Sequence, residues 1–358
     1  MKIALVLERF GAGGTGLYAV RLATGLAARG HAVTVFAVAG APVDGVDLRP
    51  LRVPVRRGVL GLAALVHASQ AIPRHEFDVV SGFGRTLGHD VFRAGGGAHA
   101  AWLDVRKTLD GATLAVAKAP RDLFERWIDR RAVTEAKRVI ANSDMAANDL
   151  YTFYSVPAER VRVVRNGVDA TRFRPDADRR TSGRASLGVP DDGRVAMFVG
   201  HGFLRKGLAT AADAFLRVAG PADRFVVLGH DAHAERHLRP VRASLRERLV
   251  VLGSVADPER WLPAADATLL PTWYDAAANT TLEAMACGVP PVTSTRDGNA
   301  ELLPHDLIAR PGDVAGFAAA LSAAWEGAFG PLVREAALRW PDVRNTEATE
   351  NVYHEIAP

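Results

Sequence analysis

Cysteine and long apolar runs are what this sequence most lacks. Cys287 is the only cysteine among 358 residues, so the chain can form neither an internal disulfide nor a zinc site built from several cysteines. The apolar start, residues 3–7, stops at Glu8 and Arg9 and predicts a buried strand rather than a signal peptide. No run approaches the roughly 18 apolar residues that span a bilayer. We therefore expect a cytoplasmic protein whose contact with a membrane, if any, is peripheral.

A large excess of charge is also missing, since the formal net charge is only +4. The stretch 106–138 holds nine basic and five acidic residues, and therefore carries an excess equal to that of the whole chain. Within it, the apolar segment 114–117 lies beside arginines, a combination that suits docking on anionic lipid. A solvated helical face is the alternative. No basic groove studded with aromatic residues is present, so we expect no nucleic-acid partner.

The remaining composition is that of a globular protein, with 48% hydrophobic and 23% charged residues, and the length suits two α/β domains. Residues 2–7 predict a strand, about 15–29 a helix and 31–38 a second strand. Such a βαβ unit implies a parallel sheet with right-handed crossovers. Further strands are predicted near residues 48–53, 77–81, 90–94, 138–141 and 161–165.

The polar segment 173–192 contains two prolines and several arginines, and we interpret it as an interdomain linker. The α/β pattern then restarts. Strands are predicted at 195–199, 224–228, 249–252, 267–270 and 291–293, with a helix reaching about residue 218 and mainly helical structure from about 311. The pattern predicts two Rossmann-like, doubly wound domains, 1–172 and 173–337, which face a ligand cleft at the carboxyl ends of their strands.

The first turn, Gly11–Gly16, matches the GxGxxG pattern of nicotinamide-dependent enzymes. Three residues separate the strand from the first glycine, and the second strand ends without the acidic residue that would bind a ribose. Dinucleotide binding is therefore disfavoured. Gly13 and Gly14 could instead let backbone amides approach phosphate or sugar oxygens, or could form a plain turn.

A second glycine-bearing loop, 200–207, follows a predicted buried strand and contains Arg205 and Lys206. Two cations at the start of a helix oppose the helix dipole, which is more readily tolerated if an anion binds there. A diphosphate needs such fixed positive charge. The alternative is a solvated pair of cations on a turn.

The next predicted strand leads into a loop with Asp275, and a helix begins near Asn279. Asp275 and Glu283 are eight residues apart. The backbone amides of Asn279, Thr280 and Thr281 would be free at the start of this helix. Cys287 lies on its apolar side and is interpreted as a core residue.

Several of these motifs, in order along nearly the whole chain, resemble the retaining GT-B glycosyltransferases of family 4. The Asp275–Glu283 spacing is similar to the E-x7-E signature of that family, and Arg205-Lys206-Gly207 is similar to its donor-phosphate motif. Further similar segments are Gly13-Gly14, Ala27–His31 and Asn166–Asp169 with Phe173 and Pro175. The resemblance implies the GT-B fold of two Rossmann-like domains, with a C-terminal helix, 338–358, that crosses back onto the first domain.

A narrower resemblance involves Ser81–Gly84 and Gly88–Phe92, which are similar to segments of the lipopolysaccharide core glucosyltransferases that add glucose to inner-core heptose. It implies a hexosyltransferase that moves a sugar, with retention, from a nucleotide-diphosphate sugar, preferably a UDP-sugar, to a lipopolysaccharide-core or other glycan or glycolipid acceptor. No metal and no further cofactor are expected. Segment 106–138 would contact the anionic inner membrane surface from the cytoplasmic side.

The family resemblance also implies residue roles. Asp275, His99 and Lys206 would be catalytic, with Asp275 and His99 against the transferred sugar. The donor would be bound by Gly13, Gly14, Arg205, Lys206, Ser254, Val255, Asn279, Thr280, Thr281 and Glu283. Among these, Lys206 and Arg205 would bind the diphosphate, Glu283 the ribose, and Ser254 and Val255 would border the base.

Three positions depart from the family pattern. His99 follows glycines where members often carry a His or Asp facing the sugar, and a structural histidine is the alternative. Asp275 stands where the family usually has glutamate, one methylene longer, and His201 stands where many members have an arginine, for which Arg205 could compensate. Asp176–Asp178 matches the DxD metal motif by letter, but no strand precedes it, so we interpret the match as chance. Two alternatives stay open: a GT-B nucleotide-sugar epimerase and a non-catalytic nucleotide-sugar binding protein.

Overall fold

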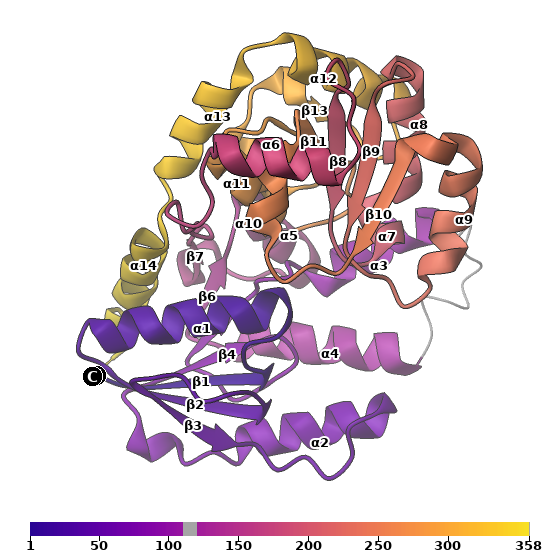
Figure 1. The fold of residues 1–358 in the computed structure, drawn as a ribbon. Coiled ribbons are helices and arrows are strands. Elements are labelled where there is room, and N and C mark those ends of the chain that lie inside the picture. The colour runs from indigo at the N-terminus through magenta and orange to yellow at the C-terminus, as the bar shows by residue number, and fades with distance from the viewer. Residues whose placement is uncertain (110–119, 358) are drawn as a thin grey trace. The chain divides into compact units, whose positions relative to one another are not determined.

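The computed structural model describes residues 1–109 and 120–357. The chain divides into two compact units (Figure 1). Unit 1 comprises Met1–Gly167 together with Asp342–Pro358, and unit 2 comprises Val168–Pro341. The sequence-based boundaries were 172/173 and 337/338, so the observed divisions differ from them by five and four residues.

Unit 1 is built on a seven-stranded sheet in which every pairing is parallel, with the order β3-β2-β1-β4-β5-β6-β7. Its strands are β1 (Lys2–Arg9), β2 (Ala32–Ala39), β3 (Val46–Pro50), β4 (Val79–Phe83), β5 (Val91–Arg93), β6 (Arg138–Ala141) and β7 (Val161–Val163). Its helices are α1 (Gly13–Ala28), α2 (Gly58–Gln70), α3 (His99–Leu109), α4 (Pro120–Glu135), α5 (Asp144–Tyr154) and α14 (Asp342–His354). The strand order reverses between β1 and β4, as in doubly wound folds.

The alternation along β1 divides the core of unit 1 into two layers. Ile3, Leu5 and Leu7 pack with α1 and α14 on one face of the sheet, and Figure 1 shows these two helices side by side. Ala4 and Val6 point to the other face, where α2 covers them. Successive side chains of a strand point to opposite faces, so a fully buried strand must be apolar at every position.

The C-terminal helix α14 is fastened to α1 by polar contacts as well as by apolar packing. The Tyr18 hydroxyl donates a hydrogen bond to Asn345 (3.0 Å), and the Asn345 amide donates to the carbonyl of Arg165 (2.6 Å). Arg29 and His31, at the end of α1 and the start of β2, both contact the carboxylate of Glu350. The last segment of the chain is therefore an integral part of unit 1.

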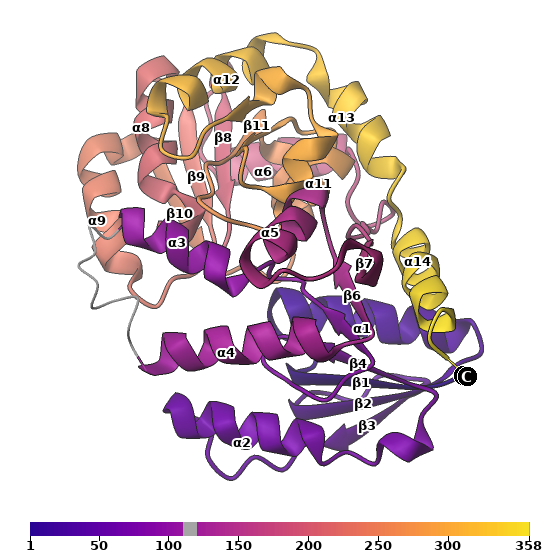
Figure 2. The ribbon, with the colours of Figure 1, turned by 180° about the vertical axis from the view of Figure 1, so that it is seen from behind.

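Unit 2 has a six-stranded parallel sheet with the order β10-β9-β8-β11-β12-β13, seen at the top of Figures 1 and 2. Its strands are β8 (Val195–Val199), β9 (Arg224–Leu228), β10 (Leu249–Gly253), β11 (Ala267–Leu270), β12 (Pro291–Ser294) and β13 (Ile308–Ala309). Its helices are α6 (Ala177–Ser186), α7 (Phe203–Lys206), α8 (Leu208–Val218), α9 (Ala234–Leu245), α10 (Pro258–Trp261), α11 (Asn279–Ala286), α12 (Val314–Glu326) and α13 (Phe329–Leu338). Here the order reverses between β8 and β11.

The interpretation of 173–192 as a linker is wrong, because this segment contains helix α6. Asp176 is its N-cap, and its carboxylate accepts a hydrogen bond from the backbone N–H of Arg179 (3.0 Å). Arg180 and Arg184 hold the helix on unit 2 through the carboxylate of Asp266. The polarity that suggested a linker comes from a helix fixed to its unit by ion pairs. Asp176 thus has a capping role.

Arg205 and Lys206 directly precede Gly207, the N-cap of helix α8, so they lie at the start of the helix that the sequence predicted to reach about residue 218. Both lie in the last turn of the short helix α7, and Gly207 separates α7 from α8 with a left-handed backbone (φ +78°). A Cβ at Gly207 would lie 2.1 Å from the carbonyl oxygen of Pro271, so only glycine fits. The two cations therefore lie in a single helical turn that directly precedes the first turn of α8.

Candidate functional site

The candidate site of unit 2 forms where the strand order of its sheet reverses. Strands β8 and β11 are neighbours in the sheet, and their carboxyl ends lead into the loops that hold Lys206 and Asp275. Ligands of open α/β sheets bind outside the carboxyl ends of the strands at this kind of reversal. Parallel pairing thus brings together two loops that lie about 70 residues apart in the sequence.

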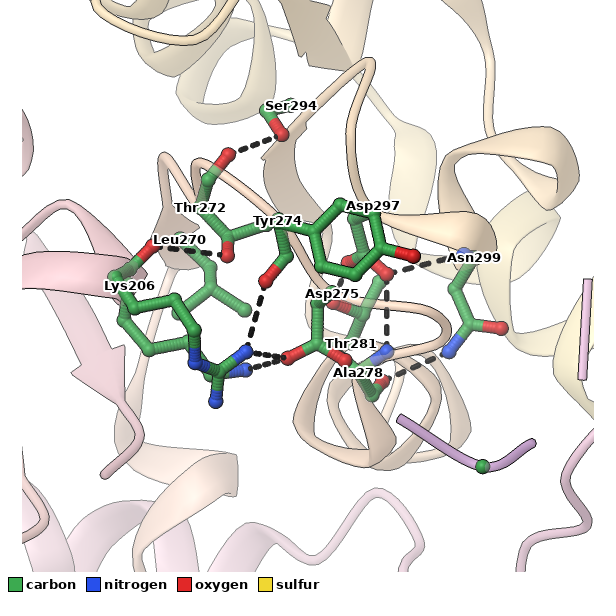
Figure 3. Close-up of polar contacts among 12 residues, drawn as sticks. Lys206, Leu270, Thr272, Tyr274, Asp275, Ala278, Thr281, Ser294, Asp297 and Asn299 are labelled. Atoms are coloured by element: carbon green, nitrogen blue, oxygen red, sulfur yellow. Dashed lines mark hydrogen bonds and ion pairs between the residues drawn. The ribbon is translucent and has the colours of Figure 1, made fainter. Parts of the chain in front are cut away.

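The predicted residues Asp275, Arg205 and Lys206 meet here, and we call them the Asp275 cluster (Figure 3). The Arg205 guanidinium donates to Asp275 Oδ2 (3.0 Å) and to the carbonyl of Tyr274 (2.8 Å). The Lys206 ammonium donates to the same carboxylate oxygen. The side chains of Lys206 and Asp275 are only 8% and 16% exposed, so this pair is largely withdrawn from water, whereas the side chain of Arg205 is 35% exposed.

The charges of the cluster determine the protonation of Asp275. Burial alone would raise the pKa of this carboxyl, but the positive charges of Lys206 and Arg205 lower its pKa to about 2. Asp275 is therefore ionised at neutral pH. One carboxylate faces two cations, so the cluster keeps a positive excess directed at the carboxyl edge of the sheet, as an anionic ligand requires.

Asp297 supports the loop of Asp275, and the sequence-based search missed it. It is 1% exposed. Its Oδ1 accepts hydrogen bonds from the backbone N–H groups of Ala278 (3.0 Å) and Asn299 (3.1 Å), and its Oδ2 accepts from the hydroxyls of Thr281 (2.6 Å) and Thr293 (3.0 Å). Figure 3 shows Asp297 beside Asn299 and Ala278. Asp297 thereby ties the start of α11 to the end of β12.

The neighbouring carboxylates affect each other. Burial and, after it, the negative charge of Asp275 raise the pKa of Asp297, while the hydrogen bonds from Ala278 and Thr281 lower it. Asp297 precedes a glycine in the loop directly after a buried strand, β12, which adjoins β11. That position is the sequence signal that could have revealed it.

The predicted donor residues of α11 lie on its first two turns. Asn279 begins the helix, and the hydroxyl of Thr281 donates its hydrogen bond to Asp297. Glu283, which is half-buried, lies one turn further along the helix. The buried hydroxyl of Thr280 has no hydrogen-bond partner within the described residues. Cys287, at the end of this helix, is buried, and burial raises the pKa of its thiol to about 12, which fits a core residue.

The remaining predicted residues of unit 2 lie elsewhere on the same sheet edge. Ser254 is exposed directly after the edge strand β10, and Val255 packs partly on the core. Two strands, β9 and β8, separate β10 from β11, so Ser254 follows a strand that is not adjacent to the one leading to Asp275. His201 accepts a hydrogen bond at Nδ1 from the backbone N–H of His230 (3.0 Å), which fixes its ring in the loop after β8.

Gly13 and Gly14 open helix α1 of unit 1. Gly13 has a left-handed backbone (φ +69°), and a Cβ at either glycine would meet no atom within 4 Å, so the space beside both residues is open. Gly16 is the constrained glycine of this turn, because its Cβ would lie 2.4 Å from the carbonyl oxygen of Arg9. The turn thus combines one glycine needed for close packing with two that leave the helix start uncovered.

His99 is the first residue of α3 in unit 1. Its backbone N–H donates to Asp129 (2.9 Å), and its Nε2 lies 3.6 Å from a carboxylate oxygen of Glu125. Burial lowers the pKa of His99, against the opposing effects of Asp129 and Glu125. The neutral form of the imidazole is therefore favoured. This form can donate a hydrogen bond to a sugar hydroxyl or accept one from it.

One group of side chains among the described residues has the geometry of a metal site. His99, Asp122 and Glu125 offer ligand atoms that lie within 4.8 Å of one another. Their carboxylates are already engaged by arginines, Asp122 by Arg106 and Glu125 by both Arg85 and Arg121. A cation would have to displace these guanidinium groups, so the residues fit a set of ion pairs better than a metal.

The basic stretch 106–138 is only partly described, and its apolar segment 114–117 lies outside the described residues. Many basic residues of the described part form ion pairs within unit 1, including Arg106, Arg121, Arg131, Lys137 and Arg138. Leu123 and Trp127, one turn apart on α4, are 51% and 44% exposed. No helix among the described residues is both long and apolar enough to cross a membrane.

The sequence matches two family descriptions in succession, Glycosyltransferase Family 4 over residues 12–172 and Glycosyl transferases group 1 over residues 193–326. A probable transglycosylase of Burkholderia thailandensis is 32% identical over 85% of this chain and 80% of its own length. D-inositol 3-phosphate glycosyltransferases of Catenulispora acidiphila and Saccharomonospora viridis are 31% and 32% identical over 68% of this chain, and the match spans only 61% of their length.

Solved structures match the fold over nearly the entire chain. WaaG, a glycosyltransferase involved in lipopolysaccharide biosynthesis, superposes with a TM-score of 0.79 at 20% identity, covering 99% of each chain. Anabaena HepE in complex with UDP-glucose gives a TM-score of 0.72 at 18% identity, covering 99% of this chain and 100% of HepE. These matches confirm the predicted fold, two Rossmann-like domains of the GT-B type.

Proposed function

Because the chain belongs to the family 4, group 1 glycosyltransferases, we propose that it moves a sugar from a nucleotide-diphosphate sugar to a glycan or glycolipid acceptor. The Asp275 cluster carries this proposal, because it gathers two cations at the strand reversal of unit 2. A diphosphate supplies the oxygens that such cations bind, and it takes up negative charge as the sugar departs.

The roles follow from the chemistry of each side chain. Arg205 and Lys206 bind the diphosphate and stabilise the charge on the leaving nucleotide. Asp275 holds both cations in place and accepts hydrogen bonds from the transferred sugar. Glu283 accepts from the ribose hydroxyls, and the unpartnered hydroxyl of Thr280 lies on the helix start where sugar or phosphate oxygens would bind.

Retention is part of the proposal. The bond from the sugar to the diphosphate breaks, the acceptor oxygen bonds to the sugar on the same face, and the departing phosphate takes the acceptor's proton. No protein nucleophile is required, so catalysis consists of positioning and charge stabilisation. His99, in its neutral form, would contact the transferred sugar. No step of this scheme requires a metal.

UDP-sugars are the donors that we favour. The HepE structure, which has the same fold, contains UDP-glucose, and WaaG acts in lipopolysaccharide biosynthesis. A lipopolysaccharide-core acceptor would be reached from the inner membrane surface, for which α4 offers exposed Leu123 and Trp127 beside the cations Arg126 and Arg130. Replacing Leu123 and Trp127 by serine should then weaken sedimentation with phosphatidylglycerol vesicles.

The first experiment is thermal unfolding with UDP, GDP, ADP, TDP and NAD. A nucleotide at about a hundred times its dissociation constant stabilises by roughly 2.7 kcal/mol and raises the midpoint by several degrees. We expect a shift with one nucleoside diphosphate, UDP, and none with NAD. A shift with NAD alone would contradict the proposed donor site. The absence of a shift with all five compounds would contradict it as well.

Two variants test the site itself. Lys206→Ala and Glu283→Ala should both lose turnover and the UDP-dependent shift, whereas Arg239→Ala removes an exposed cation of α9 and should change neither. Wild-type rates in both site variants would refute the assignment. Product analysis without acceptor separates the alternatives, because an epimerase converts the nucleotide sugar alone and a non-catalytic binder converts nothing.

A further inference from the structure

A second cationic region lies in unit 1, at the carboxyl ends of β1 and β2. It is a hollow of about 550 Å³, within the range of pockets that hold small ligands. Its charged lining consists of Arg9, Arg56, Arg57, Arg85, Arg121 and Glu8. We call this hollow the arginine pocket. It adjoins β1, and Arg85 follows β4, so it lies at the strand reversal of the unit 1 sheet.

The five arginines differ in whether their charge is compensated. Arg85 and Arg121 both donate to Glu125, each at 2.8 Å. By contrast, none of the described residues forms an ion pair with Arg9, Arg56 or Arg57. Glu125 neutralises part of the charge of Arg85 and Arg121, whereas the guanidinium groups of Arg9, Arg56 and Arg57 repel one another across the pocket. A ligand with at least two negative charges would relieve that repulsion.

The backbone around the pocket holds two of these arginines in place. Gly61, inside α2, lies so close to the preceding loop that a Cβ there would sit 2.7 Å from the carbonyl carbon of Arg56. The loop therefore packs against the helix, which fixes the backbone positions from which the side chains of Arg56 and Arg57 extend. Helix α2 also has no acidic residue in its first turn and no side-chain cap, so its first N–H groups add to the positive end of the pocket.

The floor of the pocket is apolar, formed by Val53, Leu62 and Leu65, all of which are buried. Low-dielectric walls strengthen the attraction between the arginines and an anion. The pocket thus combines uncompensated charge, a volume suited to a small group and a wall that excludes water on one side.

We propose that the arginine pocket binds a phosphate group of the acceptor, which makes the acceptor of this glycosyltransferase a phosphorylated molecule. A phosphate carries up to two negative charges and three acceptor oxygens, and guanidinium groups bind it in bidentate fashion. That the phosphate belongs to an acceptor rests on the proposed function. The phosphate site itself follows from unit 1 alone.

Phosphate can reach the pocket on a soluble acceptor or on a lipid headgroup. The experiment follows phenylglyoxal modification of individual arginines by mass spectrometry, with inorganic phosphate as the probe and sodium chloride keeping the ionic strength constant. At about ten times its dissociation constant, phosphate leaves roughly a tenth of the sites free, so modification of Arg9, Arg56 and Arg57 should slow about tenfold. Arg236 and Arg239, exposed on α9, serve as the matched controls and should be unaffected.

A second arm replaces inorganic phosphate by vesicles of phosphatidylcholine with or without phosphatidic acid, whose headgroup is a phosphate monoester. Protection by the vesicles that contain phosphatidic acid identifies a lipid headgroup as the source, and protection by inorganic phosphate alone identifies a soluble one. Either result supports the site. Equal protection of all exposed arginines would overturn the proposed site, and so would the absence of any protection. An Arg9→Gln variant should also weaken the protection of Arg56 and Arg57.

The experiment contains no nucleotide, so its outcome is independent of the donor site. If UDP caused no thermal shift, the proposed function would be refuted, but the proposed phosphate site would not be. If UDP caused a thermal shift but phosphate did not protect the pocket arginines from modification, only the phosphate site would be refuted.

Discussion

The two units gather cations at equivalent places, the strand reversals of their sheets, but treat them differently. In unit 2, Lys206 is 8% exposed and shares the carboxylate of Asp275 with Arg205. In unit 1, Arg56 and Arg57 are exposed and form no ion pair with any described residue. A charge can be buried only with a partner, whereas an exposed charge can stay unpaired because water solvates it.

The two clusters also differ in what holds their side chains in position. The Asp275 cluster is preorganised by the protein, because Asp297 and its hydrogen bonds hold the loop that presents the carboxylate. In the arginine pocket, Glu125 holds the side chains of Arg85 and Arg121, whereas Arg56 and Arg57 are positioned only through the backbone that packs against Gly61. Substitutions in unit 2 should therefore affect stability and activity together, and those in unit 1 mainly ligand binding.

Replacing Asp275 by asparagine should give the largest effect. Lys206 would remain buried without its carboxylate, which costs about 3–5 kcal/mol of folding free energy, and turnover should fall about 100-fold or more, as on loss of one charge-stabilising group. Urea unfolding and sugar-transfer assays measure both. Asp275→Glu keeps the charge and serves as the control. If Asp275→Asn were as stable as the wild type, the pairing of these charges would contribute little.

Replacing Gly207 by alanine should have the next largest effect. The new Cβ would meet the carbonyl oxygen of Pro271 at 2.1 Å in a left-handed backbone, so we expect a loss of about 2–4 kcal/mol. Gly202→Ala is the matched control, because Gly202 has the same φ of +78° but no atom within 4 Å of its Cβ. Equal losses in the two variants would show that backbone strain alone matters.

The stability contributed by Asp275 should depend on pH in a defined window. Its folded pKa of about 2 lies below the ordinary value of about 3.9, so its contribution is complete above that value and is lost as pH falls towards 2. The stability difference between the wild type and Asp275→Asn should shrink by about 2 kcal/mol across this window. Equilibrium unfolding at a series of pH values tests this, and a difference that stays constant would contradict the lowered pKa.

The smallest effect is expected for Arg57→Gln in unit 1. Because Arg57 has no ion-pair partner within the described residues, the free energy of unfolding should change by no more than about 0.5 kcal/mol. Arg85→Gln, which removes a partner of the buried Glu125, should destabilise more. A large loss with Arg57→Gln would mean that the pocket's charge is compensated within the protein, which would weaken the contrast between the two units.

Apolar periodicity made much of the fold predictable. The predicted strand 138–141 coincides with β6 (Arg138–Ala141), and 195–199 coincides with β8 (Val195–Val199). Buried parallel strands are short apolar runs bounded by turns, so their positions are legible without tertiary information. Segment 173–192 was misread because the charges of α6 are satisfied by Asp266, about 80 residues away in the sequence.

The candidate site was predictable in its residue types but not in its contacts. Loops after buried strands identified Arg205, Lys206 and Asp275. Asp297 was missed because two of its four partners, Ala278 and Thr281, lie 19 and 16 residues away in the sequence. The arginine pocket was missed for the same reason. Its arginines come from the ends of β1, β4, the loop before α2 and the start of α4.

By itself, the sequence determined the βα alternation, the glycine turns and the chemical types that gather after the strands, because these depend on periodicity and on local backbone geometry. Only the tertiary structure decided which charges neutralise one another. Parallel pairing of β8 with β11 placed Asp275 between two cations, whereas the arrangement around β1 and β2 left Arg56 and Arg57 uncompensated. Charge interactions act through space and fall with distance, so their outcome depends on pairings between distant segments that no local pattern records.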